Sequence, residues 1–133
     1  MHTKAERENL ATVERTFDAF ARRDMATVAA TFHEKAHWHM PSTGVLKGNY
    51  RGRDQILGFF AHLEHETEGS FSTIPVTLAA SGSRVFAQNL TTAKRNGNAW
   101  TWQVVLVFEF AAGVATSVQE YMLDYPAVRR FWT

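Results

Sequence analysis

Residues 23–41 read RDMATVAATFHEKAHWHMP, and the spacing of their apolar residues changes from helical to extended within this stretch. Asp24 is a good N-cap, and the apolar residues that follow it predict a short helix that ends near His33. Residues 37–40 then form an extended run, which Pro41 stops because proline has no N–H to donate within a sheet. The chain therefore passes from a helix to a strand through a short connection.

Two further helices are predicted on either side of this stretch. Residues 3–23 carry apolar residues at steps of three and four, which is typical of an amphipathic helix. Residues 42–52 contain three glycines and are predicted to be a loop. Asp54 then opens another helix, which Gly69 closes.

The second half of the chain has the pattern of strands. Residues 71–80, 84–94, 99–110 and 114–123 are rich in β-favouring residues, with turn sequences between them, and a last short helix over 125–132 starts at Asp124. The element order α-α-β-α-β-β-β-β-α predicts one α+β domain over residues 1–133. In it, the N-terminal helices pack on one face of a curved antiparallel sheet.

The composition excludes several classes of protein. The chain has 133 residues, of which 45% are hydrophobic, so it can bury a core of its own. Fourteen basic and 13 acidic residues give a net charge of +1, so we expect no nucleic-acid or membrane partner. The absence of cysteine, of a signal-peptide pattern and of a membrane-length apolar run leads us to expect a cytoplasmic protein.

Four motifs carry a resemblance to a known family. They are WHMP at 38–41, GNYRGRDQI at 48–56, QEY at 119–121 and DYPAVRRFW at 124–132. Together with residues 23–41, they resemble the SnoaL-like polyketide cyclase branch of the NTF2-like superfamily. The resemblance implies a cone-shaped fold with a hydrophobic pocket, no cofactor, and homodimers that form through the sheet. Because this superfamily contains enzymes, ligand-binding proteins and assembly domains, function requires separate evidence.

Ketosteroid isomerases belong to the same superfamily and offer a test. The resemblance places their oxyanion-binding tyrosine, their aspartate base and their second acid donor at Thr16, Met40 and Leu106. A thioether cannot abstract a proton from carbon and a leucine cannot donate a hydrogen bond, so we expect no ketosteroid isomerase activity. The comparison also implies that Met40 and Leu106 face the inside of the cone.

Strand alternation extends this inner face to the tryptophans. Trp38, Trp100 and Trp102 then point inward as well, where they either form an aromatic wall for a flat apolar ligand or fill the interior. On the last strand, Glu120 and Met122 share the inner face. Burial disfavours the ionised form of a carboxyl, so Glu120 could act as a general acid or base. Alternatively, its side chain reaches solvent or pairs with an arginine.

Two further residues are candidates, and the resemblance suggests the first of them. Asp124 matches the acid/base residue near the end of the final strand in SnoaL-like cyclases, but it could equally cap the last helix. Tyr50, in the loop after the first strand, could donate a hydrogen bond to a substrate carbonyl, so that Tyr50 and Thr16 would orient an oxygen of the substrate. Alternatively, Tyr50 packs as a half-buried ring.

The histidines give no metal site. His37 and His39 share one face of the first strand, and His-x-His is a known ligand geometry. That face is opposite to Trp38 and Met40, and the sequence nominates no third ligand, so we expect no metal.

Three functions follow from these observations. The first is a cofactor-free enzyme that moves a proton on a small aromatic or hydrophobic carbonyl compound, in an aldol-type cyclisation, an isomerisation or a dehydration. The second is a protein that binds such a compound without changing it. The third is a dimeric assembly domain whose cone is filled. Epoxide hydrolysis would need an Asp-Arg-Asp trio inside the cone, and the sequence shows none.

Overall fold

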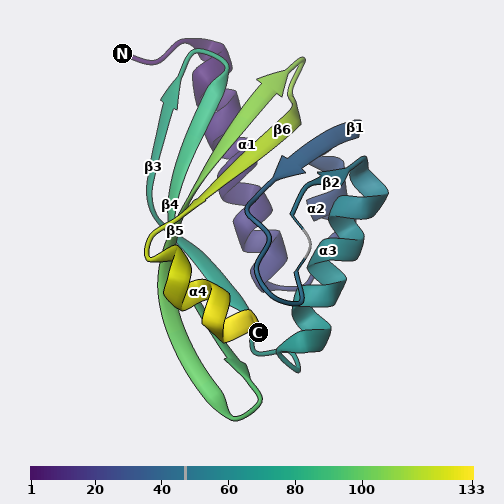
Figure 1. Ribbon diagram of the computed structural model, residues 1–133. Helices are drawn as coiled ribbons and strands as arrows, with labels where there is room; N and C mark the ends of the chain where they lie inside the picture. The colour runs from purple at the N-terminus through teal and green to yellow at the C-terminus, as the bar shows by residue number, and fades with distance from the viewer. Residues whose placement is uncertain (47) are drawn as a thin grey trace.

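The computed structural model describes residues 1–46 and 48–133, which contain four helices and six strands (Figure 1). In chain order they are α1 (Lys4–Ala21), α2 (Met25–Ala30), β1 (Phe32–His39), β2 (Tyr50–Arg51), α3 (Arg53–Glu66), β3 (Ser72–Ser81), β4 (Arg84–Arg95), β5 (Asn98–Ala111), β6 (Val114–Met122) and α4 (Tyr125–Trp132). The predicted α+β class is confirmed. Among these helices, none combines the length and the apolar content that a membrane span requires.

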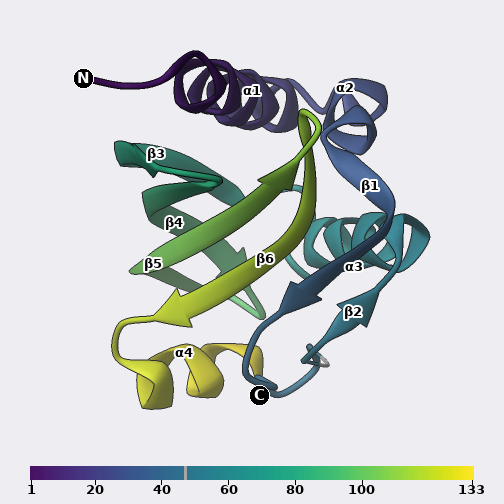
Figure 2. The ribbon, with the colours of Figure 1, turned by 90° about the horizontal axis from the view of Figure 1, so that it is seen from above.

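The strands form a single curved sheet in the order β2-β1-β6-β5-β4-β3. Figure 2 shows α1 and α4 at opposite ends of β6. β1 and β6 run parallel, with Trp38 opposite Val118, whereas the other neighbouring strands are antiparallel. The prediction of a wholly antiparallel sheet is wrong for this pair. Only strands joined by a hairpin must be antiparallel, and β1 and β6 lie far apart in the sequence.

The region around Thr31 also differs from its prediction. α2 ends at Ala30 instead of near His33, and Phe32 already belongs to β1, where it pairs with Ala115. The Ala115 N–H donates to the Thr31 carbonyl over 2.8 Å, so pairing with β6 stops the helix. β2 is an additional strand inside the predicted loop 42–52, because Tyr50 and Arg51 pair with β1. Lys47, in the same loop, lies outside the described residues.

α4 and residues 42–46 close one end of the space between helices and sheet. Trp132 is buried, and its carbonyl accepts a hydrogen bond of 3.0 Å from the Val45 N–H. Gly44 fits beneath it with a φ of +54°, and a Cβ there would lie 2.2 Å from the Trp132 carbonyl oxygen. Arg95 donates to the Phe131 carbonyl over 3.3 Å. This end of the fold therefore depends on backbone contacts that require glycine at position 44.

Arg95 also pairs with Glu66 at 3.0 Å, and the two side chains are only 9% and 22% exposed. Arg95→Met should lower the free energy of unfolding by about 2 kcal/mol, because the Glu66 carboxylate then stays largely buried without its partner. The control is Lys4→Met, which removes the ion pair with Glu8, where the side chains are 83% and 64% exposed. We expect the free energy of unfolding of that variant to fall by less than about 0.5 kcal/mol. Urea-induced unfolding measures both losses, and equal values would contradict the role of Arg95.

Candidate functional site

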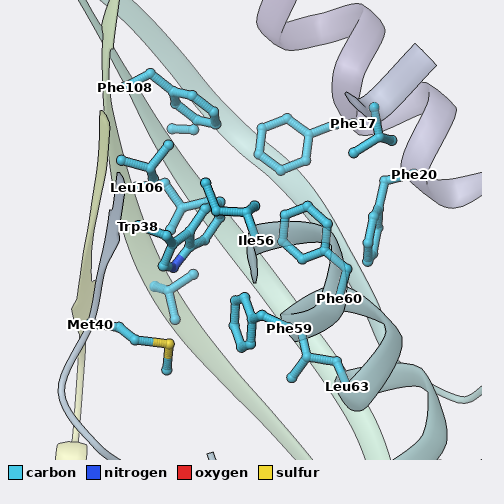
Figure 3. Close-up of a cluster of buried hydrophobic side chains, with 14 of the residues drawn as sticks. Phe17, Phe20, Trp38, Met40, Ile56, Phe59, Phe60, Leu63, Leu106 and Phe108 are labelled. Carbon is cyan, nitrogen blue, oxygen red and sulfur yellow. The ribbon is translucent and has the colours of Figure 1, made fainter. Parts of the chain in front are cut away.

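A cavity of about 70 Å³ lies between the concave face of the sheet and the helices. Its lining is almost wholly apolar, and residues from all four helices contribute to it. Figure 3 shows how rings from α1 and α3 face the side chains of β1 and β5. The volume is about half of the roughly 150 Å³ that holds a benzene molecule in an engineered cavity. A ring-sized ligand would therefore need some displacement of the lining side chains.

Most of the residues predicted to line the cone do line the cavity. Strand alternation brings those on β1, β5 and β6 to the same face, as predicted. Met40 directly follows β1, and α1 contributes Thr16. The predicted residues that line the cavity are Thr16, Trp38, Met40, Trp102, Leu106, Glu120 and Met122.

Three predicted site residues lie elsewhere. Trp100 shares the face of Trp102 but is 41% exposed, because it lies near the tip of the β4–β5 hairpin, and its predicted place in the pocket is wrong. Tyr50 is half-buried and stacks on Phe59 with ring centroids 4.3 Å apart, outside the cavity lining. Asp124 is exposed and outside the lining too. It occupies the N-cap position of α4 in a left-handed conformation, and its side chain makes no capping hydrogen bond.

Glu120 is the one ionisable residue among the described residues that line the cavity. The Trp38 indole N–H donates to its Oε1 over 3.2 Å. No described arginine or lysine pairs with it, so the alternative of an arginine partner does not hold. The carboxyl therefore lies among apolar side chains with one neutral donor.

Burial raises the pKa of Glu120 to about 7, and the hydrogen bond from Trp38 opposes this shift only in part. The charged form loses hydration in the cavity, and a single indole N–H does not replace it. Near neutral pH the carboxyl is thus divided between its acid and its base form. Both forms are then present for proton transfer.

The cavity also contains hydroxyl groups that the sequence analysis missed. Thr73 and Thr91 line it, and Asn89 is fully buried beside them. The signal was present in the sequence. Residues 85, 87, 89, 91 and 93 alternate as Val, Ala, Asn, Thr and Ala, so Asn89 and Thr91 fall on the apolar, inward face of β4.

The hydroxyl of Thr16 is already engaged. It donates to the Thr12 carbonyl over 2.7 Å and lies 2.5 Å from the Thr31 hydroxyl. Because the Thr16 proton goes to Thr12, Thr31 must be the donor in the second hydrogen bond. Thr16 thus contributes surface to the cavity but no proton for the oxygen of a ligand.

His37 and His39 lie on the opposite face of β1, as predicted, with ring centroids 3.6 Å apart. Burial lowers the pKa of His37, and the nearby His39 and Arg51 lower it further. Within the described part of the chain, no three histidine, aspartate or glutamate side chains gather closely enough to hold a metal ion.

The raised pKa of Glu120 predicts a pH-dependent stability. An unfolded Glu120 titrates near 4.5 and the folded one near 7, so the folded state retains a proton that the unfolded state loses in between. As the pH rises from about 4.5 to above 7, the free energy of unfolding of wild type should therefore fall by up to about 3 kcal/mol relative to that of Glu120→Gln. Urea-induced unfolding of both proteins at pH 4.5 and pH 8 measures this difference. A constant difference would contradict the desolvated carboxyl.

Comparisons with known proteins show the family and the fold of the chain. The family model described as SnoaL-like domain matches residues 13–118. An uncharacterized protein of Mycobacterium tuberculosis H37Rv is 27% identical over 121 residues, which are 90% of this chain and 92% of that protein. The structure of Bal32a from a soil-derived mobile gene cassette superposes with a TM-score of 0.94 and 31% identity, covering 98% of this chain and 100% of that one.

A more distant structure shares the fold alone. A putative SnoaL-like polyketide cyclase from Jannaschia sp. CCS1 has a TM-score of 0.79 at 19% identity, covering 98% of this chain and 95% of that one. The family model spans most of the chain, and the helices packed on one curved sheet match the expected fold. The chain therefore belongs to the SnoaL-like family of the NTF2-like superfamily.

Proposed function

We propose that the protein binds a small apolar carbonyl compound in the cavity, and that Glu120 exchanges a proton with the carbon next to the carbonyl. The observation that carries this proposal is the Glu120 carboxyl, the one carboxyl among the described residues of the cavity lining, which Trp38 holds among apolar side chains and whose pKa lies near neutral pH. Such a group suits the proton transfer of an isomerisation, a dehydration or an aldol-type cyclisation. These reactions need no cofactor.

The neighbouring side chains have separate roles in this proposal. Trp38 holds Oε1 of Glu120, which leaves the other carboxyl oxygen to face the ligand. Trp102 presents an indole ring to the cavity, on which a flat ligand can stack. Met40 and Met122 are flexible and can adapt to the outline of the ligand.

A second candidate function is binding without chemistry. It is favoured by Thr16, Met40 and Leu106, which line the cavity where ketosteroid isomerases have their acid and base groups. The cavity would then only sequester an apolar compound. The two functions differ in one respect, because binding alone does not depend on the charge of Glu120.

We also propose that the protein forms a homodimer through the outer face of the sheet. Val105, Val107 and Gln119 are half-buried there, while Phe86 and Tyr121 are 37% and 57% exposed. These five residues carry no charge, and a two-fold axis would set the same patch against itself. A second copy would cover this apolar surface.

Proton exchange on acetophenone in D₂O tests the enzymatic function without the natural substrate. Wild type should speed up the exchange of the methyl protons next to the carbonyl at least tenfold over Glu120→Gln, as general base catalysis does, and the rate should rise with pH through about 7. Proton NMR follows the exchange. Asp124→Asn should keep the wild-type rate, because Asp124 lies outside the cavity.

Two results would contradict this proposal. If acetophenone binds equally to wild type and Glu120→Gln but exchanges at the same rate in both, the protein only binds its ligand. If acetophenone fails to bind wild type at millimolar concentration, the class of ligand is wrong.

Val105→Lys should convert the dimer to a monomer, because it sets two positive charges close together at the shared face. Light scattering after size-exclusion chromatography gives the mass. Val45→Lys is the control, because Val45 is exposed on the loop beside α4, away from the outer face of the sheet. A monomeric wild type, or a dimeric Val105→Lys, would contradict the proposed interface.

A further inference from the structure

A pair of threonine hydroxyls lines the cavity on β3 and β4, away from Glu120. The Oγ1 atoms of Thr73 and Thr91 lie 3.1 Å apart, and both residues belong to the lining. The Nδ2 atom of Asn89 donates to the Thr73 oxygen over 3.2 Å. Asn89 and Thr91 are 0% and 2% exposed, whereas Thr73 is half-buried.

This pair has a hydrogen-bond donor left over. Each threonine hydroxyl carries one proton, and the two groups share a single hydrogen bond. Asn89 supplies its own proton to Thr73 and takes none from it. Whichever threonine donates to the other, the hydrogen bonds of the described residues give one hydroxyl proton no acceptor. The Oδ1 atom of Asn89 is also buried without a partner, so the cluster offers an acceptor as well as a donor. An unmatched donor in an apolar cavity is costly unless something accepts from it.

The Thr16–Thr31 pair, of which Thr16 lines the same cavity, has no such surplus. Thr16 donates to the Thr12 carbonyl over 2.7 Å, and Thr31 donates to Thr16 over 2.5 Å. Both of its hydroxyl protons therefore have protein acceptors. Both pairs consist of two threonine hydroxyls, and they differ in whether one hydroxyl proton is left without an acceptor. The Thr16–Thr31 pair therefore serves as a control for the Thr73–Thr91 pair.

The threonine pair and Glu120 lie at different ends of the cavity lining. Glu120 on β6 pairs with Leu106 of β5. Thr91 on β4 pairs with Trp102, which also belongs to β5. Glu120 and Thr91 thus lie two strands apart and are offset along β5. A ligand that contacts both must be elongated, and the small volume requires it to be narrow.

We propose that Thr73 and Thr91 form a second polar subsite, which donates one hydrogen bond to an acceptor oxygen at the end of the ligand remote from Glu120. The proposal rests on the proposed function, because the carbonyl of the same ligand lies near Glu120. It assigns the ligand to flat, narrow ring compounds with an oxygen function at each end. The remote oxygen is an ether, a second carbonyl or another acceptor.

Two probes of nearly the same shape test the subsite. 4-Methoxyacetophenone carries an ether oxygen where 4-ethylacetophenone carries a methylene group, and both have the same carbonyl. Quenching of the tryptophan fluorescence gives their Kd values, since Trp38 and Trp102 line the cavity. The ratio of the two Kd values cancels the contribution of the carbonyl end.

The double variant Thr73→Val/Thr91→Val removes the surplus proton and keeps the shape of both side chains. In this variant, the preference for the methoxy probe, measured as the ratio of the two Kd values, should be about three- to tenfold smaller than in wild type. A change of this size is the effect of one hydrogen bond. The matched control, Thr16→Val/Thr31→Val, should keep the wild-type ratio. Thr73→Ser/Thr91→Ser should keep it as well, because both hydroxyls are retained.

The outcomes separate the two proposals. An unchanged ratio in Thr73→Val/Thr91→Val, with both probes bound, overturns the subsite and leaves the proposed function intact. Failure of both probes to bind wild type overturns both proposals. If the double valine variant does not fold, NMR contacts in wild type between the methoxy protons and the methyl groups of Thr73 or Thr91 decide the question. Their absence overturns the subsite.

Discussion

The parallel pairing of β1 with β6 is the contact on which the site depends. It sets Trp38 beside Val118, and the Trp38 indole then reaches the carboxyl of Glu120 two residues further along β6. The same ladder stops α2, since the Thr31 carbonyl accepts from Ala115. Without this pairing the cavity would lose one wall, and Glu120 would lie at an open edge of the sheet with its carboxyl in water.

Desolvation without a charged partner raises the pKa of Glu120. A buried ion pair would hold the carboxyl in its charged form, whereas one indole donor leaves the two forms close in free energy. The folded state is less stable for this at high pH. In the proposed function, this cost in stability accompanies a proton that can move in either direction near neutral pH.

Much of the fold and part of the site could be predicted because strand alternation is a local rule. The resemblance to ketosteroid isomerases placed Met40 and Leu106 on the inner face, alternation extended that face to Trp38 and Glu120, and the structure agrees. Alternation says nothing about how far the helices extend over a strand, which is why Trp100 is exposed. The parallel direction of β1, the left-handed backbone of Asp124 and the surplus proton of the threonine pair depend on contacts between distant segments, which no local pattern contains.

The separation of Trp38 and Glu120 by 82 positions has a consequence for synthesis of the chain. Ribosomes add about 5 to 20 residues per second, so β1 waits several seconds before β6 emerges to pair with it. During this time, Phe32 and Trp38 belong to a strand with an open edge, next to helices that cannot yet enclose them. High contact order also slows the search for this pairing. The nascent protein is therefore most vulnerable to aggregation through the strand that later forms one wall of the cavity.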